Sequence, residues 1–320
     1  MARVPPVHVV ILNWNGAPDT VACLDSLSGQ KGVDLRLIVV DNGSTDDSVP
    51  RISGWAAEHP ACQVELIQSG TNLGFAVGSN AGIKRALEAG AEFILVLNND
   101  TLLAPDAIAH LARFLVDHAD YVGVTPQIRY AGRPVVWNCG GDLTWSGSRK
   151  YLYGEEPIEA VPRSGWRRIT FITGCAALFR ASMFREHGLY TERFFFGEED
   201  YELSRRLHRL HLPLACCFDS VIEHKVGSSI DRAAPPAMLG RYYLYYLNRF
   251  IDMRDYYPTA WWWLWRLGSL AVVAPKLRAR HLSWRAMWVL FRRLLRDSSR
   301  LDGVSKERFE AATRSGPESI

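Results

Sequence analysis

The fold of this chain is decided by the stretch Phe93–Asp100, which reads FILVLNND. Its apolar run is long enough for a strand that crosses a buried sheet, and the polar residues must then emerge at the carboxyl edge of that sheet. Open α/β folds bind their ligands at this edge. The stretch therefore predicts a ligand site at Asn98, Asn99 and Asp100, although Asn and Asp are also the usual residues of a simple turn after a strand.

Strands and helices alternate on the N-terminal side of this stretch, and polar loops follow the strands. Such alternation predicts an α/β fold with a mainly parallel central sheet and helices on both faces. The expected elements are strands over 7–12, 35–40, 64–67 and 93–97 and helices over 19–27 and 76–89.

The alternation weakens on the C-terminal side. We expect a helix over 105–118 and a short strand over 122–124. Residues 127–168 are rich in Gly, Trp, Tyr and Arg without clear periodicity, which is typical of a region that shapes a site. A strand is expected over 169–180, with small residues at its middle that allow close approach of a ligand or backbone. A helix over 199–208 opens on acidic residues, which favour a helix N-terminus.

The composition is that of a globular protein. The chain has 320 residues, of which 48% are apolar and 22% charged, and this excludes disordered and fibrous classes. Its six cysteines show no Cys-x-x-Cys spacing, and the apolar stretch over 7–12 is too short for a secretory signal. We therefore expect a cytoplasmic protein without a structural zinc site.

Charge is distributed unevenly along the chain. Up to Pro235 there are 22 Lys and Arg against 27 Asp and Glu, and after it 15 against 7. The first part thus carries −5 and the tail +8, which predicts an anionic partner for the tail, either a membrane face or nucleic acid. We expect a catalytic domain over 1–235, with a nucleotide half over 1–100 and an acceptor half over 101–235, and a basic extension over 236–320.

The tail combines aromatic and basic residues. Residues 241–250 read RYYLYYLNRF, and the apolar stretch over 261–275 is shorter than a membrane-spanning helix requires. Residues 284–295 form an amphipathic basic pattern with Trp288, Phe291, Leu294 and Leu295 on its apolar side. The tail is expected to lie on a membrane surface; the alternative is that its helices pack on the catalytic domain or on a second copy of the chain in a homo-oligomer.

Taken together, the motifs resemble those of the family 2 glycosyltransferases, which have the GT-A fold. The resemblance runs from residue 7 to about 230, and in detail it is similar to the bacterial rhamnosyltransferase-like branch, which has a late His-x-x-Gly-x-Ser element. The matching stretches are VILNWN at 10–15, VVDNGSTD at 39–46, NLGF at 72–75 with Gly78 and Asn80, NND at 98–100, Thr173-Gly174, FFFGEED at 194–200 and HKVGSS at 224–229.

The resemblance implies a nucleoside-diphosphate sugar as donor and a divalent cation, Mn²⁺ or Mg²⁺, as cofactor. Oxygen ligands hold such cations, which stabilise a departing diphosphate. The resemblance assigns Asp100 to the metal and places Asn98 near the ribose or the bridging oxygens. It also makes His224 a second metal ligand; the alternative is a histidine at a strand end that bonds the backbone.

Further residues are implied to bind the nucleotide sugar. The carboxylate of Asp41 could accept the N3–H of a uracil or thymine ring, and its alternative role is an Asx-turn that caps the next helix. The residues expected to bind the nucleotide sugar are Asn13, Asn15, Asp41, Gly43, Asn72, Gly74, Asn80, Asn98, Asn99, Asp100 and Gly174.

An inverting transfer needs a carboxylate that deprotonates the acceptor hydroxyl. The resemblance assigns this general base to Asp200, with Glu199 in reserve, whereas the plain alternative is acidic charge at a helix N-terminus. The phenylalanines over 194–196 are expected either to form a wall beside a sugar or to belong to the core.

The predicted function is a metal-dependent inverting glycosyltransferase at the inner face of the plasma membrane. It would move L-rhamnose from a dTDP donor to a cell-surface glycan or lipid-linked acceptor, or else galactofuranose or another hexose from a dTDP or UDP donor. A nucleotidyltransferase would need a basic Gly-rich loop after the first strand, and NWNG at 13–16 has no basic residue. A nucleic-acid partner is not expected, because it would leave Asp100, Asp200 and His224 without a role.

Overall fold

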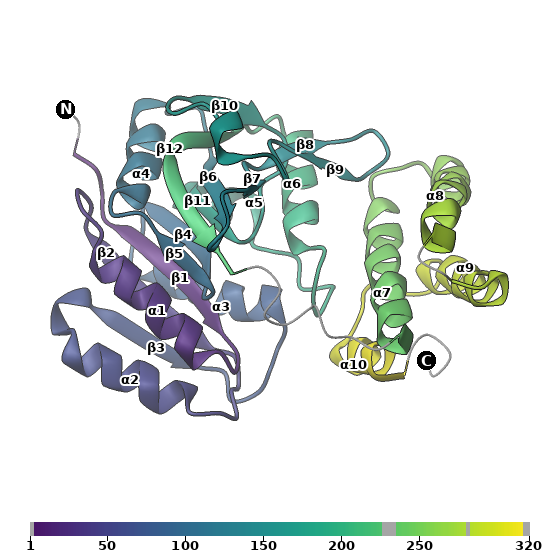
Figure 1. Ribbon diagram of the computed structural model, residues 1–320, viewed down its shortest axis with the longest axis horizontal. Helices are drawn as coiled ribbons and strands as arrows, with labels where there is room; N and C mark the ends of the chain where they lie inside the picture. Colours follow the sequence, from purple (N-terminus) through teal and green to yellow (C-terminus); the bar gives the residue numbers. More distant parts are fainter. Residues whose placement is uncertain (1–2, 226–234, 280–281, 316–320) are drawn as a thin grey trace. The chain divides into compact units, whose positions relative to one another are not determined.

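The computed structural model describes residues 3–225, 235–279 and 282–315 (Figure 1). The glycine and serines of the HKVGSS stretch lie outside these residues. Contacts divide the chain into two compact units, which are described separately below. Unit 1 consists of Met1–Leu143, Arg149–Thr191 and Glu199–Ser228, and unit 2 of Thr144–Ser148, Glu192–Glu198 and Ser229–Ile320.

Unit 1 contains a mixed sheet and six α-helices among its described residues. The strands are β1 Val7–Asn13, β2 Leu35–Asp41, β3 Val64–Gln68, β4 Phe93–Asn98, β5 Thr101–Leu103, β6 Gly123–Tyr130, β7 Val136–Asn138, β8 Gly141–Leu143, β9 Arg149–Tyr151, β10 Trp166–Ile169, β11 Ala176–Arg180 and β12 Leu214–His224. The helices are α1 Ala17–Ser28, α2 Ser48–Glu58, α3 Phe75–Glu88, α4 Ala107–Asp117, α5 Ala181–His187 and α6 Glu199–Arg209, with short 3₁₀ turns at Pro60–Cys62 and Ile158–Ala160.

The sheet runs in the order β10-β12-β6-β11-β4-β1-β2-β3. The four strands predicted over the first hundred residues are confirmed, and they pair in parallel in the order β4-β1-β2-β3. β11 then joins β4 to β6 by antiparallel pairing on both sides. The register places Asn13 opposite Asp41 and Leu12 opposite Asn98, so the polar ends of β1, β2 and β4 lie side by side.

Alternate residues of these strands face opposite layers of helices, as the two-residue period of a strand requires. Leu95 and Leu97 of β4 pack with residues of α1, α2 and α4. Ile94 and Val96 pack with residues of α3, α5 and α6 on the other face. Full burial of each such side chain stabilises the fold by about 1.5–3 kcal/mol. The buried core therefore holds the polar strand ends in place.

The single strand expected over 169–180 is wrong in its middle part. Residues 166–169 form β10 and residues 176–180 form β11, while the stretch between them leaves the ladder. Its backbone N–H groups find other partners: Phe171 donates to the carbonyl of Gly141 at 2.9 Å, and Ile172 donates to Ser204 Oγ at 3.1 Å. The turn at Gly174 thereby separates β10 from β11, whereas the sequence pattern predicts one continuous strand.

Unit 2 is mainly helical. Its hydrophobic core contains residues of all its helices together with Phe194 and Val304. Ser283 caps α9, because its hydroxyl accepts the N–H of Ala286 at 3.1 Å. Among the helices that the structure describes, none is long and apolar enough to cross a bilayer. The helices are α7 Pro235–Met253, α8 Thr259–Ala279, α9 Trp284–Ser298 and α10 Lys306–Ser315.

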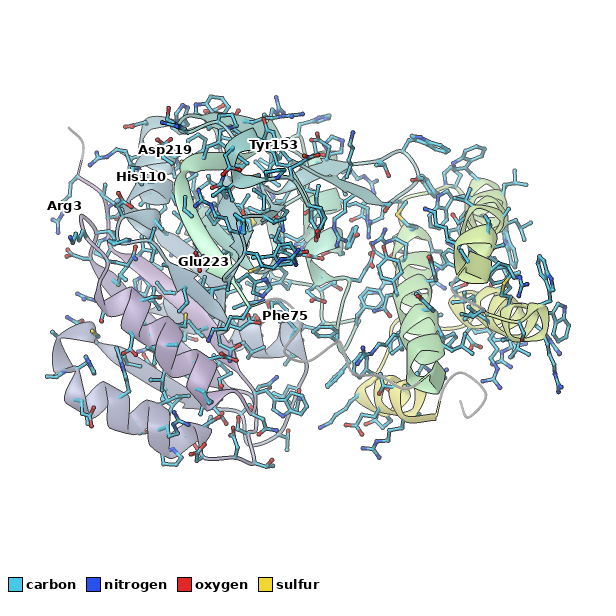
Figure 2. The ribbon with its side chains drawn as sticks, viewed as in Figure 1. Arg3, Phe75, His110, Tyr153, Asp219 and Glu223 are labelled. Atoms are coloured by element: carbon cyan, nitrogen blue, oxygen red, sulfur yellow. The ribbon has the colours of Figure 1, made fainter. Side chains whose placement is uncertain are left out.

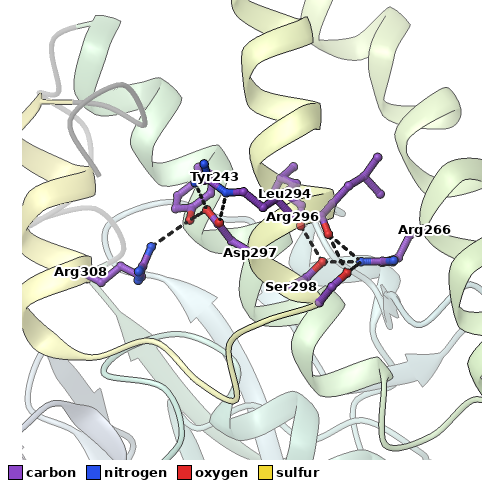
Figure 3. A network of polar contacts seen from close by, with 9 residues as sticks. Tyr243, Arg266, Leu294, Arg296, Asp297, Ser298 and Arg308 are labelled. Carbon is purple, nitrogen blue, oxygen red and sulfur yellow. Dashed lines mark hydrogen bonds and ion pairs between the residues drawn. The ribbon is translucent and has the colours of Figure 1, made fainter.

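A polar network crosses the interior of unit 2 (Figure 3). The hydroxyl of Tyr243 donates to Asp297 Oδ2 at 2.6 Å, and Arg296 Nε donates to Asp297 Oδ1 at the same distance. Arg266 is fully buried and donates from Nη1 to Ser298 Oγ at 2.7 Å. Its guanidinium also lies 3.5 Å from the ring centroid of Trp262. Burial, together with the smaller effect of the Arg254 charge, lowers the pKa of Arg266 to about 10.

Candidate active site

The first part of the site is a set of polar side chains at the ends of β1 and β2. Asn13 is buried, and its Nδ2 donates to Asp41 Oδ1 at 2.8 Å and to Ser44 Oγ at 3.1 Å. Asp41 also accepts the backbone N–H of Ser44 at 3.0 Å and its hydroxyl at 2.5 Å. Both carboxylate oxygens of Asp41 thus hold the loop closed. The alternative expected for Asp41 is an Asx-turn that caps the next helix. The hydrogen bonds close residues 41–44 but do not cap α2, which begins after Asp47.

The loop after β2 is fastened by further residues. Asn15 has φ 51°, and its Oδ1 accepts the N–H of Thr45 at 2.8 Å. Gly43 has φ 72°, and a Cβ there would come within 2.3 Å of the carbonyl carbon of Thr71, so only glycine fits. Asn72 Oδ1 accepts the N–H of Gly74 at 2.9 Å. These predicted nucleotide residues therefore lie on three neighbouring loops, after β1, β2 and β3, at one edge of the sheet.

Asn80 has a different environment. It is buried in α3, where its Nδ2 donates to the carbonyl of Tyr190 at 2.9 Å and its Oδ1 accepts the N–H of Tyr190 at 3.1 Å. These two hydrogen bonds join α3 to the chain after α5. Its expected contact with a nucleotide stays a prediction.

The stretch after β4 joins the same network. Asn99 Nδ2 donates to Thr20 Oγ1 at 2.9 Å, and Thr20 Oγ1 donates to Asn13 Oδ1 at 2.7 Å. The carbonyl of Asn98 accepts the hydroxyl of Thr101 at 2.7 Å. Thr20 links the loops after β1 and β4, a role that sequence reasoning missed because a threonine in the first turn of a helix gives no signal of its own.

Asp100 and His224 form the second part of the site. Asp100 Oδ1 lies 3.0 Å from His224 Nε2, and both side chains are largely buried. Pairing of β5 with β12 brings them together, because Thr101 lies opposite His224 in the register. The ring of Trp137 packs against that of His224 at 4.6 Å between centroids. Figure 2 labels Glu223, which precedes His224, and Phe75, which begins α3, and so marks where these two segments lie.

This pair fits two ligands of a divalent cation, since carboxylate oxygen and imidazole nitrogen both serve in such sites. Nδ1 of His224 is buried without a hydrogen-bond partner, and Nε2 is the nitrogen that faces Asp100. The part of the chain that the structure describes holds no cluster of three or more metal-ligating side chains. A cation there would need further oxygen ligands from a diphosphate or from water.

The third part of the site is the turn at Thr173-Gly174-Cys175. A Cβ built on Gly174 would lie 3.9 Å from Asp200 Cβ and 3.5 Å from the ring of Phe75. The pKa of the Cys175 thiol is raised well above its ordinary value, first by burial and then by the charge of Asp100. The backbone N–H of Asn98 also donates to the carbonyl of Cys175 at 2.8 Å, which ties the turn to the end of β4. Asp100 and Asp200 therefore both lie near one short turn, which the sequence does not reveal.

Asp200 and Glu199 begin α6, where their charges favour the helix N-terminus. Glu199 is 7% exposed, whereas Asp200 is partly exposed. Burial, against the opposing charge of Arg149 and with a smaller contribution from the charge of Asp200, raises the pKa of Tyr151 to about 12. The greater exposure of Asp200 favours it over Glu199 as the carboxylate that reaches a substrate.

The phenylalanines over 194–196 belong to unit 2. Phe194 is buried in the core of that unit, and Phe195 and Phe196 pack against Phe309 of α10. The core alternative is thus confirmed for Phe194. Aromatic side chains near the candidate base come instead from the β8–β9 hairpin and α6, and residues in this irregular region carry no periodic signal.

Comparison with known proteins adds the family. The model of glycosyl transferase family 2 matches residues 8–188. The chain is 28% identical over 242 residues to galactofuranosyltransferase GlfT1 of Mycobacterium tuberculosis, covering 75% of this chain and 76% of the relative. It is 24% identical over 247 residues to the low-salt glycan biosynthesis hexosyltransferase Agl10 of Haloferax volcanii, covering 77% and 74%.

A solved structure shares the fold. The mannosyltransferase PcManGT of Pyrobaculum calidifontis, in complex with GDP-Man and Mn²⁺, superimposes with a TM-score of 0.56 at 16% identity. The likeness covers 97% of this chain and 87% of the other. The expected GT-A fold and glycosyltransferase class are confirmed, and the chain belongs to glycosyl transferase family 2.

Proposed function

We propose that this protein is an inverting, divalent-cation-dependent glycosyltransferase. It transfers a sugar from a nucleoside-diphosphate donor to a hydroxyl group of a glycan or lipid-linked acceptor. The observation that carries the proposal is that Asp100, just after β4, and Asp200, at the start of α6, both lie near the turn at 173–175. A cation-binding carboxylate and a second carboxylate near one turn are what displacement at an anomeric carbon requires.

Asp100 and His224 would hold the cation beside the diphosphate. When bound, the cation offsets the negative charge that grows on the departing diphosphate. The polar edge formed by Asn13, Asp41 and the loop at 72–74 would bind the nucleoside. Mn²⁺ accompanies GDP-Man in the related mannosyltransferase structure, which supports a cation in this fold.

Asp200 acts on the acceptor. Its carboxylate takes the proton of the attacking hydroxyl while the new C–O bond forms at the anomeric carbon. The bond from that carbon to the diphosphate oxygen breaks on the opposite face, so the configuration is inverted. Glu199, in its more buried position, supports the start of the helix.

The donor sugar is proposed from the relatives and from the sequence. Of the two sugars predicted, galactofuranose is the one named among the relatives, in GlfT1. L-rhamnose on dTDP rests on the sequence resemblance alone. We therefore place a galactofuranosyl donor first and a rhamnosyl donor second.

Association with a membrane surface is proposed for α8 and α9. Trp261, Trp263, Trp284 and Trp288 are each at least 45% exposed. Leu294 of α9, expected on a membrane-facing side, is instead buried in unit 2. The exposed tryptophans lie with arginines, as in the contact of Arg292 with Trp288 at 5.4 Å, and this combination suits the interface of an anionic membrane.

A transfer assay tests the proposal. Purified full-length protein is offered a panel of UDP, dTDP and GDP sugars with glycan acceptors, with Mn²⁺ or Mg²⁺ and with EDTA. We expect transfer from at least one donor, loss of transfer with EDTA, and inversion at the anomeric carbon by NMR. Asp200→Asn should lower kcat by about 10²–10⁴-fold.

A matched control separates chemistry from folding. Asp106 has an exposed side chain near the start of α4, and Asp106→Asn should leave kcat unchanged. Asp100→Ala should weaken Mn²⁺-dependent binding of UDP in calorimetry. Full activity of Asp200→Asn, or transfer that persists in EDTA, would contradict the mechanism.

A further inference from the structure

The guanidinium of Arg149 lies among three aromatic rings of unit 1. Its Cζ is 4.3 Å from the ring centroid of Tyr151, 4.6 Å from Tyr201 and 5.1 Å from Phe171. Arg149 and Tyr151 are two residues apart on β9, so their side chains lie on one face of the hairpin. Tyr201 directly follows the candidate base Asp200 on α6. The β8–β9 hairpin and α6 can be followed in Figure 1.

Arg149 has no ion-pair partner among the described residues of the chain. Its Nε is buried without a hydrogen-bond acceptor. A buried donor without an acceptor is destabilising, and contacts with the ring faces offset this only in part. Guanidinium groups bind carboxylate and phosphate oxygens through paired N–H donors. The guanidinium of Arg149 is therefore suited to bind an oxyanion.

The rings around Arg149 continue toward the metal-binding pair. Trp137 lies 4.6 Å from His224 and 6.0 Å from Tyr151, centroid to centroid. Phe171 lies 6.1 Å from Tyr151 and 4.9 Å from Tyr201. An aromatic row thus connects His224 with the helix start that carries Asp200. Trp137 and Tyr151 are only half-buried, which leaves ring surface for the apolar faces of a sugar.

The positive charge of Arg149 indicates whether the aromatic row contacts the donor or the acceptor. The donor diphosphate is assigned to the cation held by Asp100 and His224. Arg149 instead lies on the ring of the residue next to Asp200, the base that touches the acceptor hydroxyl. Tyr151, whose pKa is about 12, stays a neutral phenol that can donate a hydrogen bond to a sugar.

We propose that Arg149 is a specificity-determining residue that binds an oxyanion, either a carboxylate or a phosphate, on the acceptor glycan close to the hydroxyl that Asp200 activates. This inference rests on the proposed function. The acceptor is accordingly an acidic sugar or a sugar phosphate, held with its ring against Tyr151 and Trp137.

Three acceptors with the same accepting sugar test the proposal: a neutral octyl glycoside, an octyl glycoside with a neighbouring uronic acid, and one with a neighbouring phosphodiester. Arg149→Met removes the charge but keeps an apolar chain among the rings, and Arg149→Lys keeps the charge without the paired donors. Lys150→Met is the matched control, because Lys150 is exposed and is the next residue of β9, on the opposite face.

We expect the wild type to prefer one anionic acceptor at least tenfold in kcat/KM, and that acceptor identifies the oxyanion as carboxylate or phosphate. Arg149→Met should raise its KM at least tenfold, with less than a twofold change for the neutral acceptor and for the donor. Arg149→Lys should recover part of the loss, and Lys150→Met should match the wild type.

Two results would overturn the proposal. One is equal use of neutral and anionic acceptors by the wild type. The other is an Arg149→Met variant that binds UDP normally in calorimetry yet loses both acceptors equally, or whose donor KM rises in place of the acceptor KM. A wild type that neither hydrolyses nor transfers any nucleotide sugar would instead contradict the proposed function itself.

Discussion

The two units bury their polar side chains in different ways. In unit 1, the buried set at the strand ends consists of amides and hydroxyls around one carboxylate, as in Asn13, Thr20 and Asp41. In unit 2, the buried polar residues include two arginines: Arg249 pairs with Glu198, and Arg266 lies among tryptophans and serines. Amides and hydroxyls can both donate and accept, so they suit an edge that exchanges partners with a ligand.

In unit 2, Arg249 instead forms contacts with two separate segments of the chain. Arg249 Nε lies 2.6 Å from Glu198 Oε1, with both side chains at most 5% exposed, and its Nη1 donates to the carbonyl of Gly147. Gly147 and Glu198 lie in the two short segments that continue into Arg149 and Glu199. The comparison teaches that the polar groups of unit 1 can exchange hydrogen-bond partners at a sheet edge, whereas the buried arginine of unit 2 holds separate segments of the chain together.

The largest expected effect comes from breaking the buried ion pair. Arg249→Met leaves the Glu198 carboxylate buried without this partner, and loss of one member of such a pair costs about 3–5 kcal/mol. We expect a matching drop in the free energy of unfolding, measured by urea denaturation. The double variant Arg249→Met/Glu198→Gln should recover part of the loss, and an additive double variant would show that the two residues do not act together.

Asp41→Ala is expected to have the next largest effect, now in unit 1. It leaves the Asn13 amide and two donors of Ser44 without their acceptor, at a cost of about 3 kcal/mol or less. If this edge serves a nucleotide, calorimetry should show UDP binding weakened at least tenfold even where the protein remains folded. Asp47→Ala, on the exposed side of the same loop, is the control and should bind UDP normally. Unchanged UDP binding by Asp41→Ala would contradict a ligand-binding role for the polar strand ends of unit 1, and these would then not differ in role from the buried polar residues of unit 2.

Tyr243→Phe tests the network of unit 2 with a smaller change. The variant loses one hydrogen bond to the Asp297 carboxylate, worth about 1.5 kcal/mol at pH 7. Burial opposes ionisation of Asp297, but hydrogen bonds from Arg296 and Tyr243 outweigh it and hold its pKa below the ordinary value. A lowered pKa stabilises the fold above the unfolded value near pH 4, and this stabilisation is lost as the pH falls through the native pKa.

The stability gap between wild type and Tyr243→Phe should therefore narrow below about pH 4, as followed by denaturant titration at several pH values. A gap that widens in acid would mean that the hydrogen bond does not depend on the charged form of Asp297.

The smallest effect on stability is expected on the outer surface of unit 2. Trp284→Ser with Trp288→Ser should change the free energy of unfolding by no more than about 0.5 kcal/mol per residue, because both side chains are exposed. Binding to vesicles that contain anionic lipid should fall roughly tenfold or more if these rings enter the interface. Vesicle binding is measured by co-sedimentation, and Trp166→Ser in unit 1 is the control. Equal co-sedimentation of the wild type, the double variant and the control would contradict a membrane-binding surface on α9.

Sequence reasoning predicted the parts of the fold that depend on local periodicity. The strands ending at Asn13, Asp41 and Asn98 carry clear apolar runs, and parallel pairing then brings their ends together without further information. The pair of Asp100 with His224 was implied by family resemblance, but its cause is the register between β5 and β12, which no local pattern encodes.

Other features were beyond the reach of the sequence for physical reasons. Phe194 reads equally well as core or as sugar wall, and packing against α7–α10 decides it. The position of Arg149 among three rings depends on a hairpin and a helix from distant parts of the chain. The turn that separates β10 from β11 depends on partners such as Ser204, whose hydroxyl replaces a strand neighbour.

The division of the chain also bears on how this enzyme can be altered. Unit 2 is woven from a long C-terminal stretch and two short insertions, Thr144–Ser148 and Glu192–Glu198. Unit 2 therefore cannot be removed by cutting the chain at one point. A truncation before α7 would remove Arg249 and leave the Glu198 carboxylate without this ion-pair partner. A chimera that takes the C-terminal helices of a relative would need all three segments exchanged as one set.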